Sequence, residues 1–357
     1  MKVYLKEYKN YTIRTCDLSD IQYMMKFIDK WWAKGHILSV SKKLIDWQYY
    51  NQRWDRYNFI YAIDNKNNQI LGIIGYIPTY IFDINIDNDD KYIWLSVWKV
   101  RDDYIKTAMG IQLLSAIFEL ENTKNVGTVG INQNVEPLYR MMKFNTGILD
   151  HFYIVNSSKQ TYKLICGNVK THHHTINKNI RLHLLNNENE LPEFCSKLLN
   201  REINFPIKTV NYIINRYLKH PFYKYKIFGI ETNNVKTALL ICRTAHAIGA
   251  SAIRIIDIQG TFSEMSGSYG AFQELLRQSG AEYIDLYCHG LNNEHIIAAG
   301  FTLKTPENDI IIPNYYEPFT QSNVDIRYAY HTAVKNHYII FKGDGDQDRP
   351  NHITWEE

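Results

Sequence analysis

The residues best suited to chemistry surround a short turn of small side chains, Thr107-Ala108-Met109-Gly110. The apolar run Tyr92–Val100 before it alternates in the manner of a strand, and the residues after it, up to Glu119, repeat with helical spacing. The first N–H groups of a helix have no partner inside the helix, and the helix dipole adds partial positive charge there. Small side chains let a phosphate approach these groups closely. The stretch predicts a phosphate site, although a strand–turn–helix alone is common among α/β proteins.

Composition and charge exclude several classes of protein. The 357 residues, 45% hydrophobic and 22% charged, predict a soluble globular chain with one large or two ordinary domains. A net charge of +3 without a Lys/Arg block argues against a nucleic-acid partner. No apolar run approaches the roughly 20 residues that cross a bilayer, and the first residues lack a signal-peptide pattern. We expect a cytoplasmic protein without membrane insertion; its oligomeric state is left open.

The five cysteines are scattered and contain no CxxC pair. They predict reduced thiols rather than a disulfide or zinc framework. The adjacent histidines His172-His173-His174 fall in a polar segment, and in an extended chain they point in different directions. We expect these histidine side chains to be exposed to solvent and expect no metal site.

The predicted elements occur twice in the same order. Residues 1–168 read βααβββαβαβ, a mixed sheet with a crossover helix, in which Leu38–Trp54 is one helix and Thr161–Ile165 a closing strand. After a linker at 169–179, residues 180–357 repeat the pattern, and the hairpin Lys224–Arg243 corresponds to Phe59–Tyr76. The sequence therefore predicts an α/β chain of two tandem domains. Paired domains usually hold a ligand at or near their junction.

Two motifs carry a resemblance to the GCN5-related N-acetyltransferase (GNAT) superfamily. The segment Val100–Leu114 fits the family pattern V-x-P-x-Y-R-G-x-G-x-G/A-x-x-L-L without a gap. The segment Asn132–Phe144 matches N-x-x-A-x-x-L-Y-x-x-x-G-F in register. Two motifs at the right mutual distance are more specific than either alone. The chain also looks similar to acetyltransferases of bacterial surface-polysaccharide clusters.

The resemblance implies an acyl-CoA-dependent N-acyltransferase with acetyl-CoA as co-substrate and a small-molecule amine as acceptor, first of all a nucleotide-linked amino sugar. It implies that Tyr139 is the general acid for the leaving thiolate. The implied acyl-CoA contacts lie at the end of the strand, in the loop and helix start, and after the next strand: Trp98, Lys99, Val100, Ile105, Lys106, Thr107, Ala108, Met109, Gly110, Ile111 and Asn132.

The motifs also depart from the family pattern. Ile105 replaces the Arg or Gln that opens the loop, Ala108 replaces its first glycine, and Lys143 replaces the glycine before Phe144. An alanine is tolerated there if the position is helical. In the second copy, Phe272 takes a loop-glycine position. We infer that the first copy holds acyl-CoA and the second shapes the acceptor site. The alternatives are a Fem-like aminoacyl transferase and a non-catalytic tandem GNAT module.

Four residues are candidates for acceptor binding. Asp257 and His289 fall near the ends of predicted strands, where ligands of α/β folds bind, and each is a candidate for the acceptor's base. Asn292 begins the second copy of the Asn132 motif, and Trp47 is either a sugar platform or, by preference, core or cleft wall.

The segment Gly343–Asn351 spaces three aspartates as DxDxD but lacks the remaining ligands of a calcium loop. We prefer two interpretations: a solvated tail, or a loop in which Arg349 holds the acids. A third interpretation is that the segment folds back to touch the cleft.

Overall fold

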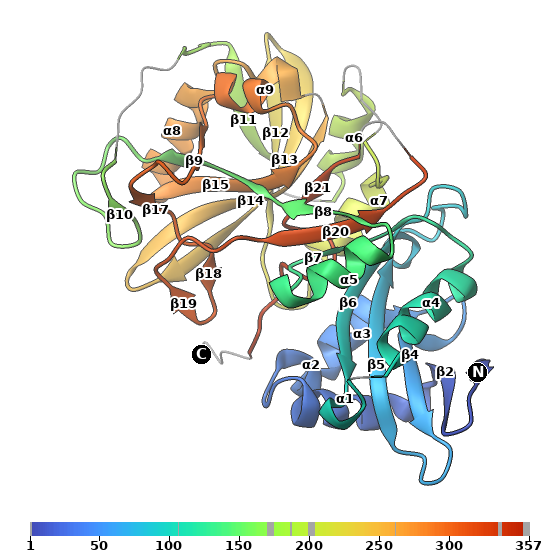
Figure 1. The fold of residues 1–357 in the computed structure, drawn as a ribbon. Helices are drawn as coiled ribbons and strands as arrows, with labels where there is room; N and C mark the ends of the chain where they lie inside the picture. Colours follow the sequence, from blue (N-terminus) through green and yellow to red (C-terminus); the bar gives the residue numbers. More distant parts are fainter. Residues whose placement is uncertain are drawn as a thin grey trace.

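The computed structural model describes residues 2–105, 107–169, 175–185, 188–198, 204–260, 262–334 and 338–352 (Figure 1). The first half contains β1 (Tyr4–Glu7), β2 (Tyr11–Cys16), α1 (Ile21–Trp31), α2 (Ile37–Val40), α3 (Lys42–Tyr49), β3 (Tyr50–Asn51), β4 (Arg56–Asp64), β5 (Ile70–Pro78), β6 (Ile93–Val100), α4 (Met109–Glu121), β7 (Val126–Val129), α5 (Glu136–Met141), β8 (Asn145–Ile148), β9 (Asp150–Val155) and β10 (Cys166–Gly167).

The second half contains β11 (Ile180–Leu185), α6 (Glu190–Ser196), α7 (Val210–Ile213), a π turn η5 (Ile214–Leu218), β12 (Lys226–Thr232), β13 (Val235–Ala247), β14 (Ala250–Gly260), α8 (Tyr269–Ser279), β15 (Tyr283–His289), α9 (Asn293–Ala298), β16 (Thr302–Leu303), β17 (Ile310–Ile311), β18 (Tyr315–Tyr316), β19 (Phe319–Thr320), β20 (Arg327–His331) and β21 (Ile340–Phe341).

Local chemistry explains where the elements begin and end. The hairpin predicted at Lys224–Arg243 is confirmed: β12 and β13 are joined by Asn233-Asn234, both with positive φ (53° and 63°), as a type I′ turn requires. The single helix predicted at Leu38–Trp54 is wrong. The side chain of Ser41 accepts a hydrogen bond from the N–H of Leu44 (3.2 Å) and starts a new helix, α3.

The closing strand predicted at Thr161–Ile165 is also wrong. The N–H groups of Lys163 and Leu164 donate to the carboxylate of Glu282, at 2.7 and 2.8 Å, rather than to a neighbouring strand. The buried carboxylate of Glu282 thus accepts the backbone hydrogen bonds that a neighbouring strand would accept in the sheet predicted from the apolar pattern.

The two sheets exchange a strand. Among the described residues the first sheet runs β1-β2-β4-β5-β6-β7-β20-β8, and the second runs β11-β12-β13-β14-β15-β9-β16. Strand β9, from the first half, therefore lies between β15 and β16, while β20, from the second half, lies between β7 and β8 (Figure 1). The division at 168 and 180 stays a prediction, but the sheets do not follow it strand for strand.

Helices cover both faces of each sheet. The faces that look outward pack on α4 and α5 in the first half and on α8 and α9 in the second. The other faces share one apolar cluster that also includes α1, α2, α3 and α7, so the two halves have a common core. None of the helices in the described part of the chain combines the length and apolar character of a membrane span.

An aromatic stack crosses this common core. The ring of Trp47, on α3, lies 4.4 Å from that of His220 and beneath the guanidinium of Arg216, and its indole N–H donates to the backbone oxygen of Asn215 (3.1 Å). His220 is 8% exposed, and its Nδ1 accepts the N–H groups that follow it. Trp47 thus joins the two halves as packing.

The strand exchange predicts an effect at a distance in sequence. Phe152, on β9, is fully buried in the core of the second sheet. We expect Phe152→Ala to lower the free energy of unfolding by about 3–5 kcal/mol in urea titrations. Hydrogen exchange should quicken first in β14 and β15. Tyr23→Ala, at a 65% exposed position, should stay within about 0.5 kcal/mol. Faster exchange confined to β4–β6 would contradict the assignment.

His220 predicts a dependence of stability on pH. Burial, with Arg216 and Arg243 nearby, lowers the pKa of His220 to about 3, whereas an unfolded histidine titrates at about 6.5. Below pH 6.5 the unfolded chain therefore binds a proton that the folded chain does not. The contribution of the neutral His220 to the free energy of unfolding is therefore complete above pH 6.5. It falls by up to about 1.4 kcal/mol per pH unit as the pH is lowered from 6.5 toward 3.

Urea titrations of His220→Asn should reveal the histidine's share, because Asn keeps an acceptor but does not titrate. We expect the variant's curve of unfolding free energy against pH to be flatter than that of the wild type between pH 6.5 and 3. His295→Asn, at an exposed position, is the control. Parallel curves for His220→Asn and the wild type would overturn the prediction.

Candidate functional site

Two neighbouring strands of the first sheet diverge after a short contact. Strands β6 and β7 pair in parallel only at Ile93–Val126 and Trp94–Gly127 within their described residues, although β6 continues to Val100. A bulge follows at once, because Leu95 pairs with Tyr76 and Trp98 with Ile74. Ser96 and Val97 lie between these pairs. The backbone of β6 beyond Trp94 is therefore not tied to β7.

An aromatic pair borders this divergence on the α4 face. Trp98 of β6 and Tyr139 of α5 meet edge to face with ring centroids 5.7 Å apart. Tyr139 is buried; burial raises its pKa, and a hydrogen bond with Thr128 of β7 opposes part of the rise. The phenol is therefore protonated at neutral pH and has a proton to donate.

The start of α4 is open. Its N-cap residue, Ala108, has φ −73° and ψ 0° and makes no side-chain cap. Thr107 and Ala108 are exposed, and Ile105 is 63% exposed. The backbone conformation at Ala108 is one that alanine adopts without strain, so the missing glycine leaves the turn intact. The N–H of Met109 donates to the Thr107 hydroxyl (3.3 Å), and the N–H groups of Gly110 and Ile111, next in the first turn, are available to an anion.

The structure brings the predicted acyl-CoA residues to one edge of the first half. Trp98, Lys99 and Val100 end β6, and the half-buried Lys99 pairs with Asp102 (2.7 Å). The backbones of Met109, Gly110 and Ile111 form the first turn of α4, where the Met109 side chain is fully buried. Asn132 lies across β7 and caps the short helix η4 (Gln133–Val135) with a 2.9 Å bond. Lys106 lies outside the described residues.

The corresponding helix start in the second half is covered. Asn177 donates to the backbone oxygen of Gly267 (3.0 Å), and Ile176 pairs with Ser268. A Cβ added to Gly270, in the first turn of α8, would lie 2.9 Å from Ile176. Part of the predicted linker thus occupies the position where the first half is open. His172-His173-His174 lie outside the described residues.

The four predicted acceptor residues have separate partners. Trp47 belongs to the stack with His220. His289 bonds through Nδ1 with the hydroxyl of Tyr328 (3.0 Å), and burial lowers its pKa. Asn292 is exposed and caps α9 through the N–H of Glu294 (2.8 Å). Asp257 is fully buried in an ion cluster. The structure does not gather them, and their role in acceptor binding stays a prediction.

The ion cluster around Asp257 ties down the acidic C-terminal segment. Lys208 lies 2.7 Å from Asp257 and 2.9 Å from Asp344. Although burial opposes its charged form, the two carboxylates raise the pKa of Lys208. Tyr217 also donates to Asp257 (2.5 Å). The two acids and the lysine therefore act as one buried charged unit.

The remaining acids of the segment are paired as well. Asp348 lies 2.9 Å from Arg243 and accepts from the Tyr225 hydroxyl (2.6 Å), while Asp346 lies 3.2 Å from Arg349. The backbone oxygen of Asn351 accepts from Ile37 in the first half (2.8 Å). The solvated-tail interpretation is wrong: the segment is buried because distant Lys and Arg side chains neutralise it. Arg349 does hold an acid, and the segment does fold back into the junction.

A small pocket of about 150 Å³ lies beside this segment. Both halves and the C-terminal segment line it, with residues that sequence reasoning did not single out: Gly130, Tyr223, Arg243, Asn314, Tyr315, Tyr316, Glu317, Ile326, Lys342, Asp346, Gln347, Arg349 and Asn351. The one signal for this pocket in the sequence is the DxDxD spacing followed by Arg349, which agrees with the interpretation that the tail touches the cleft.

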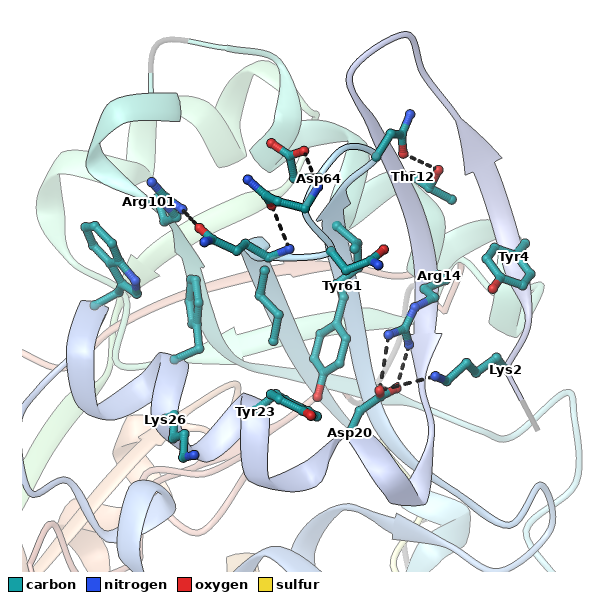
Figure 2. Close-up of a pocket in the computed structure, with 18 of the residues that line it drawn as sticks. Lys2, Tyr4, Thr12, Arg14, Asp20, Tyr23, Lys26, Tyr61, Asp64 and Arg101 are labelled. Atoms are coloured by element: carbon teal, nitrogen blue, oxygen red, sulfur yellow. Dashed lines mark hydrogen bonds and ion pairs between the residues drawn. The ribbon is translucent and has the colours of Figure 1, made fainter.

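A larger groove of about 1010 Å³ lies between α1, the β1–β2 hairpin and the β4–β5 turn (Figure 2). Two of its charged residues are paired: Arg14 with Asp20 (2.6 Å), and Arg101 with Asp103 (2.7 Å), which lies outside the groove. None of the site residues expected from the sequence lines it.

Comparisons with known proteins establish the fold. No protein-family model matches the chain, and no curated protein matches it in sequence. A GCN5-related N-acetyltransferase from Anabaena variabilis is similar in structure, with TM-score 0.53 and 12% identity over 90% of this chain and 72% of its own. A protein of Enterococcus faecalis described as a probable N-acyltransferase matches with TM-score 0.51 and 8% identity over 89% of this chain and 72% of its own. At these identities the likeness shows that the chain has the GNAT fold.

Proposed function

We propose that the protein is an acyl-CoA-dependent N-acyltransferase that moves an acetyl group from acetyl-CoA to the primary amine of a small molecule. The observation that carries the proposal is the divergence of β6 from β7 beside the open start of α4. An extended arm can enter between strands that are no longer paired, and a phosphate can bind the free N–H groups next to them. The labels of the two similar structures support the same class of reaction.

The first half contains the groups that would hold the co-substrate. The backbone N–H groups of Gly110 and Ile111 would bind the pyrophosphate, and the unpaired edge of β6 at Trp98–Val100 would bind the pantetheine arm. Acetyl-CoA itself supplies the activated acyl group. In the described part of the second half, Ile176 and Asn177 cover the start of α8.

The chain's residues can then assist a direct transfer. The acceptor nitrogen forms a bond to the acyl carbon as the carbon–sulfur bond breaks, and the proton lost by the amine goes to a base. Backbone N–H groups released by the bulge at Ser96 and Val97 would stabilise the oxyanion. Tyr139, kept protonated by burial, would protonate the departing thiolate. A nucleotide-linked amino sugar as acceptor stays a prediction.

A charge reversal at the helix start tests co-substrate binding. Thr107 is exposed just before α4. We expect Thr107→Glu to raise the acetyl-CoA dissociation constant about 10-fold in calorimetry, because its carboxylate repels a bound pyrophosphate. The helix itself should not weaken, since an acid at its N-terminus contributes about 0.3–1 kcal/mol of stability. Thr161→Glu makes the same change at an exposed loop position of the second half. Absence of acetyl-CoA binding by the wild type would sink the proposal.

The phenol of Tyr139 predicts a split between binding and turnover. Tyr139→Phe keeps the ring that packs on Trp98 and removes only the hydroxyl. Loss of a general acid should lower kcat about 100-fold or more, while the acetyl-CoA dissociation constant stays the same. The steady-state rate of free-thiol release at saturating substrates gives kcat. An unchanged kcat would rule out the acid role.

A further inference from the structure

We propose that the small pocket beside the C-terminal segment, called the junction pocket from here on, is the acceptor site. The acceptor is then a small unconjugated compound carrying a primary amine and an oxygen acceptor, as free amino acids and free amino sugars do. The inference rests on the proposed function and narrows its substrate class. It stands on the position of the pocket, its size, and the polar atoms that line it.

The pocket lies behind the divergence of β6 and β7. Gly130 directly follows β7, and Gln347 packs so tightly on it that an added Cβ would fall 2.1 Å from the amide nitrogen. Gly345 lies against Trp94, the last residue of β6 that pairs with β7. Trp94 belongs to the core shared by the two halves, whereas Trp98 and Tyr139 belong to the α4 face. In this proposal, an acyl group that enters from the α4 face would reach the C-terminal segment, which also lines this pocket.

The size of the pocket limits the acceptor. Its volume is about 150 Å³, whereas sites for drug-sized ligands span roughly 300–1,000 Å³. A nucleotide-linked sugar is larger than a typical drug, and only its reacting end would fit. A free amino acid or a free amino sugar fits as a whole.

Three buried polar atoms in the pocket lining lack a hydrogen-bond partner within the described residues. They are Oε2 of Glu317, Oδ1 of Asn314 and Nε of Arg349. Leaving such atoms unpaired costs about 1–3 kcal/mol each, so each calls for a partner. Two acceptors suit the three N–H donors of an ammonium group, and one donor suits an oxygen. A ligand with both groups would complete all three.

The charges around the pocket favour the same ligand. Arg243 is neutralised by Asp348 and Arg349 by Asp346. Lys342 is buried with its Nζ 3.1 Å from the backbone oxygen of Asn314, and burial, with Arg254 nearby, lowers its pKa well below the ordinary value. Glu317 has no ion-pair partner among the described residues, and only its Oε1 is bonded, to the Tyr223 hydroxyl (2.9 Å). The uncompensated charge is a carboxylate, which attracts an ammonium.

The test measures acceptor kinetics and acceptor binding on the full-length protein. Free amino acids, free amino sugars and nucleotide-linked amino sugars are offered with acetyl-CoA, and binding of the same compounds is measured by calorimetry without acetyl-CoA. We expect turnover and binding with one of the two free classes. Glu317→Gln should raise KM for that acceptor about 10- to 100-fold, because a hydrogen bond to a charged group is lost, with acetyl-CoA affinity unchanged. Glu307→Gln, at an exposed position, is the matched control.

A second variant guards against a folding defect in the loop of Glu317. Arg349→Lys keeps a cation beside Asp346 but removes the Nε donor. It should weaken the binding of acceptors that carry the oxygen group and leave the binding of a plain alkylamine unchanged.

If acetyl-CoA binds but only nucleotide-linked sugars are acetylated, or if Glu317→Gln and Arg349→Lys leave KM unchanged, the pocket proposal fails while the acyltransferase proposal stands. If acetyl-CoA does not bind, the acyltransferase proposal fails, and binding of a free amine to the pocket is then judged by calorimetry alone.

Discussion

The position of the C-terminal segment depends on charges buried within the second half. Lys208 is held by Asp257 and Asp344, and Arg243 by Asp348, so the loop before α7, strands β13 and β14 and the C-terminal segment meet in one charged layer. Such pairs add little net stability over apolar packing, but removing one partner leaves a buried charge, which is costly. The pairs therefore fix position more than they stabilise. They place the C-terminal segment against Trp94, and other residues of the same segment line the junction pocket.

The sequence predicted the parts of this structure that are encoded locally. The β12–β13 hairpin follows from alternating apolar residues around two asparagines, and the open start of α4 from small residues after a strand. The strand exchange could not be predicted in this way. Both β9 and β20 are short strands that mix aromatic and polar residues, and nothing in such a pattern says which sheet a strand joins. The burial of Asp348 was hidden for a similar reason, since its partner Arg243 lies 105 residues away.

The departures from the family motifs become clear from backbone angles. Ala108 has a φ of −73°, so a glycine is not required there. Lys143 has a φ of +63°, the left-handed conformation that glycine adopts most easily after a helix, and its N–H still bonds to the backbone oxygen of Arg140 (2.9 Å). The backbone angle at each position therefore accounts for the presence or absence of strain with the side chain that the sequence has there.

The strand exchange also determines when the first sheet can be completed. The slot between β7 and β8 is filled by β20, which begins about 180 residues after β8 ends. A ribosome adds roughly 5–20 residues per second, so the nascent first half waits about 10–35 s with an unpaired strand edge on each side of that slot. Exposed edges of this kind invite pairing with other chains. Biosynthesis thus imposes an interval in which these strand edges are open to pairing with other chains.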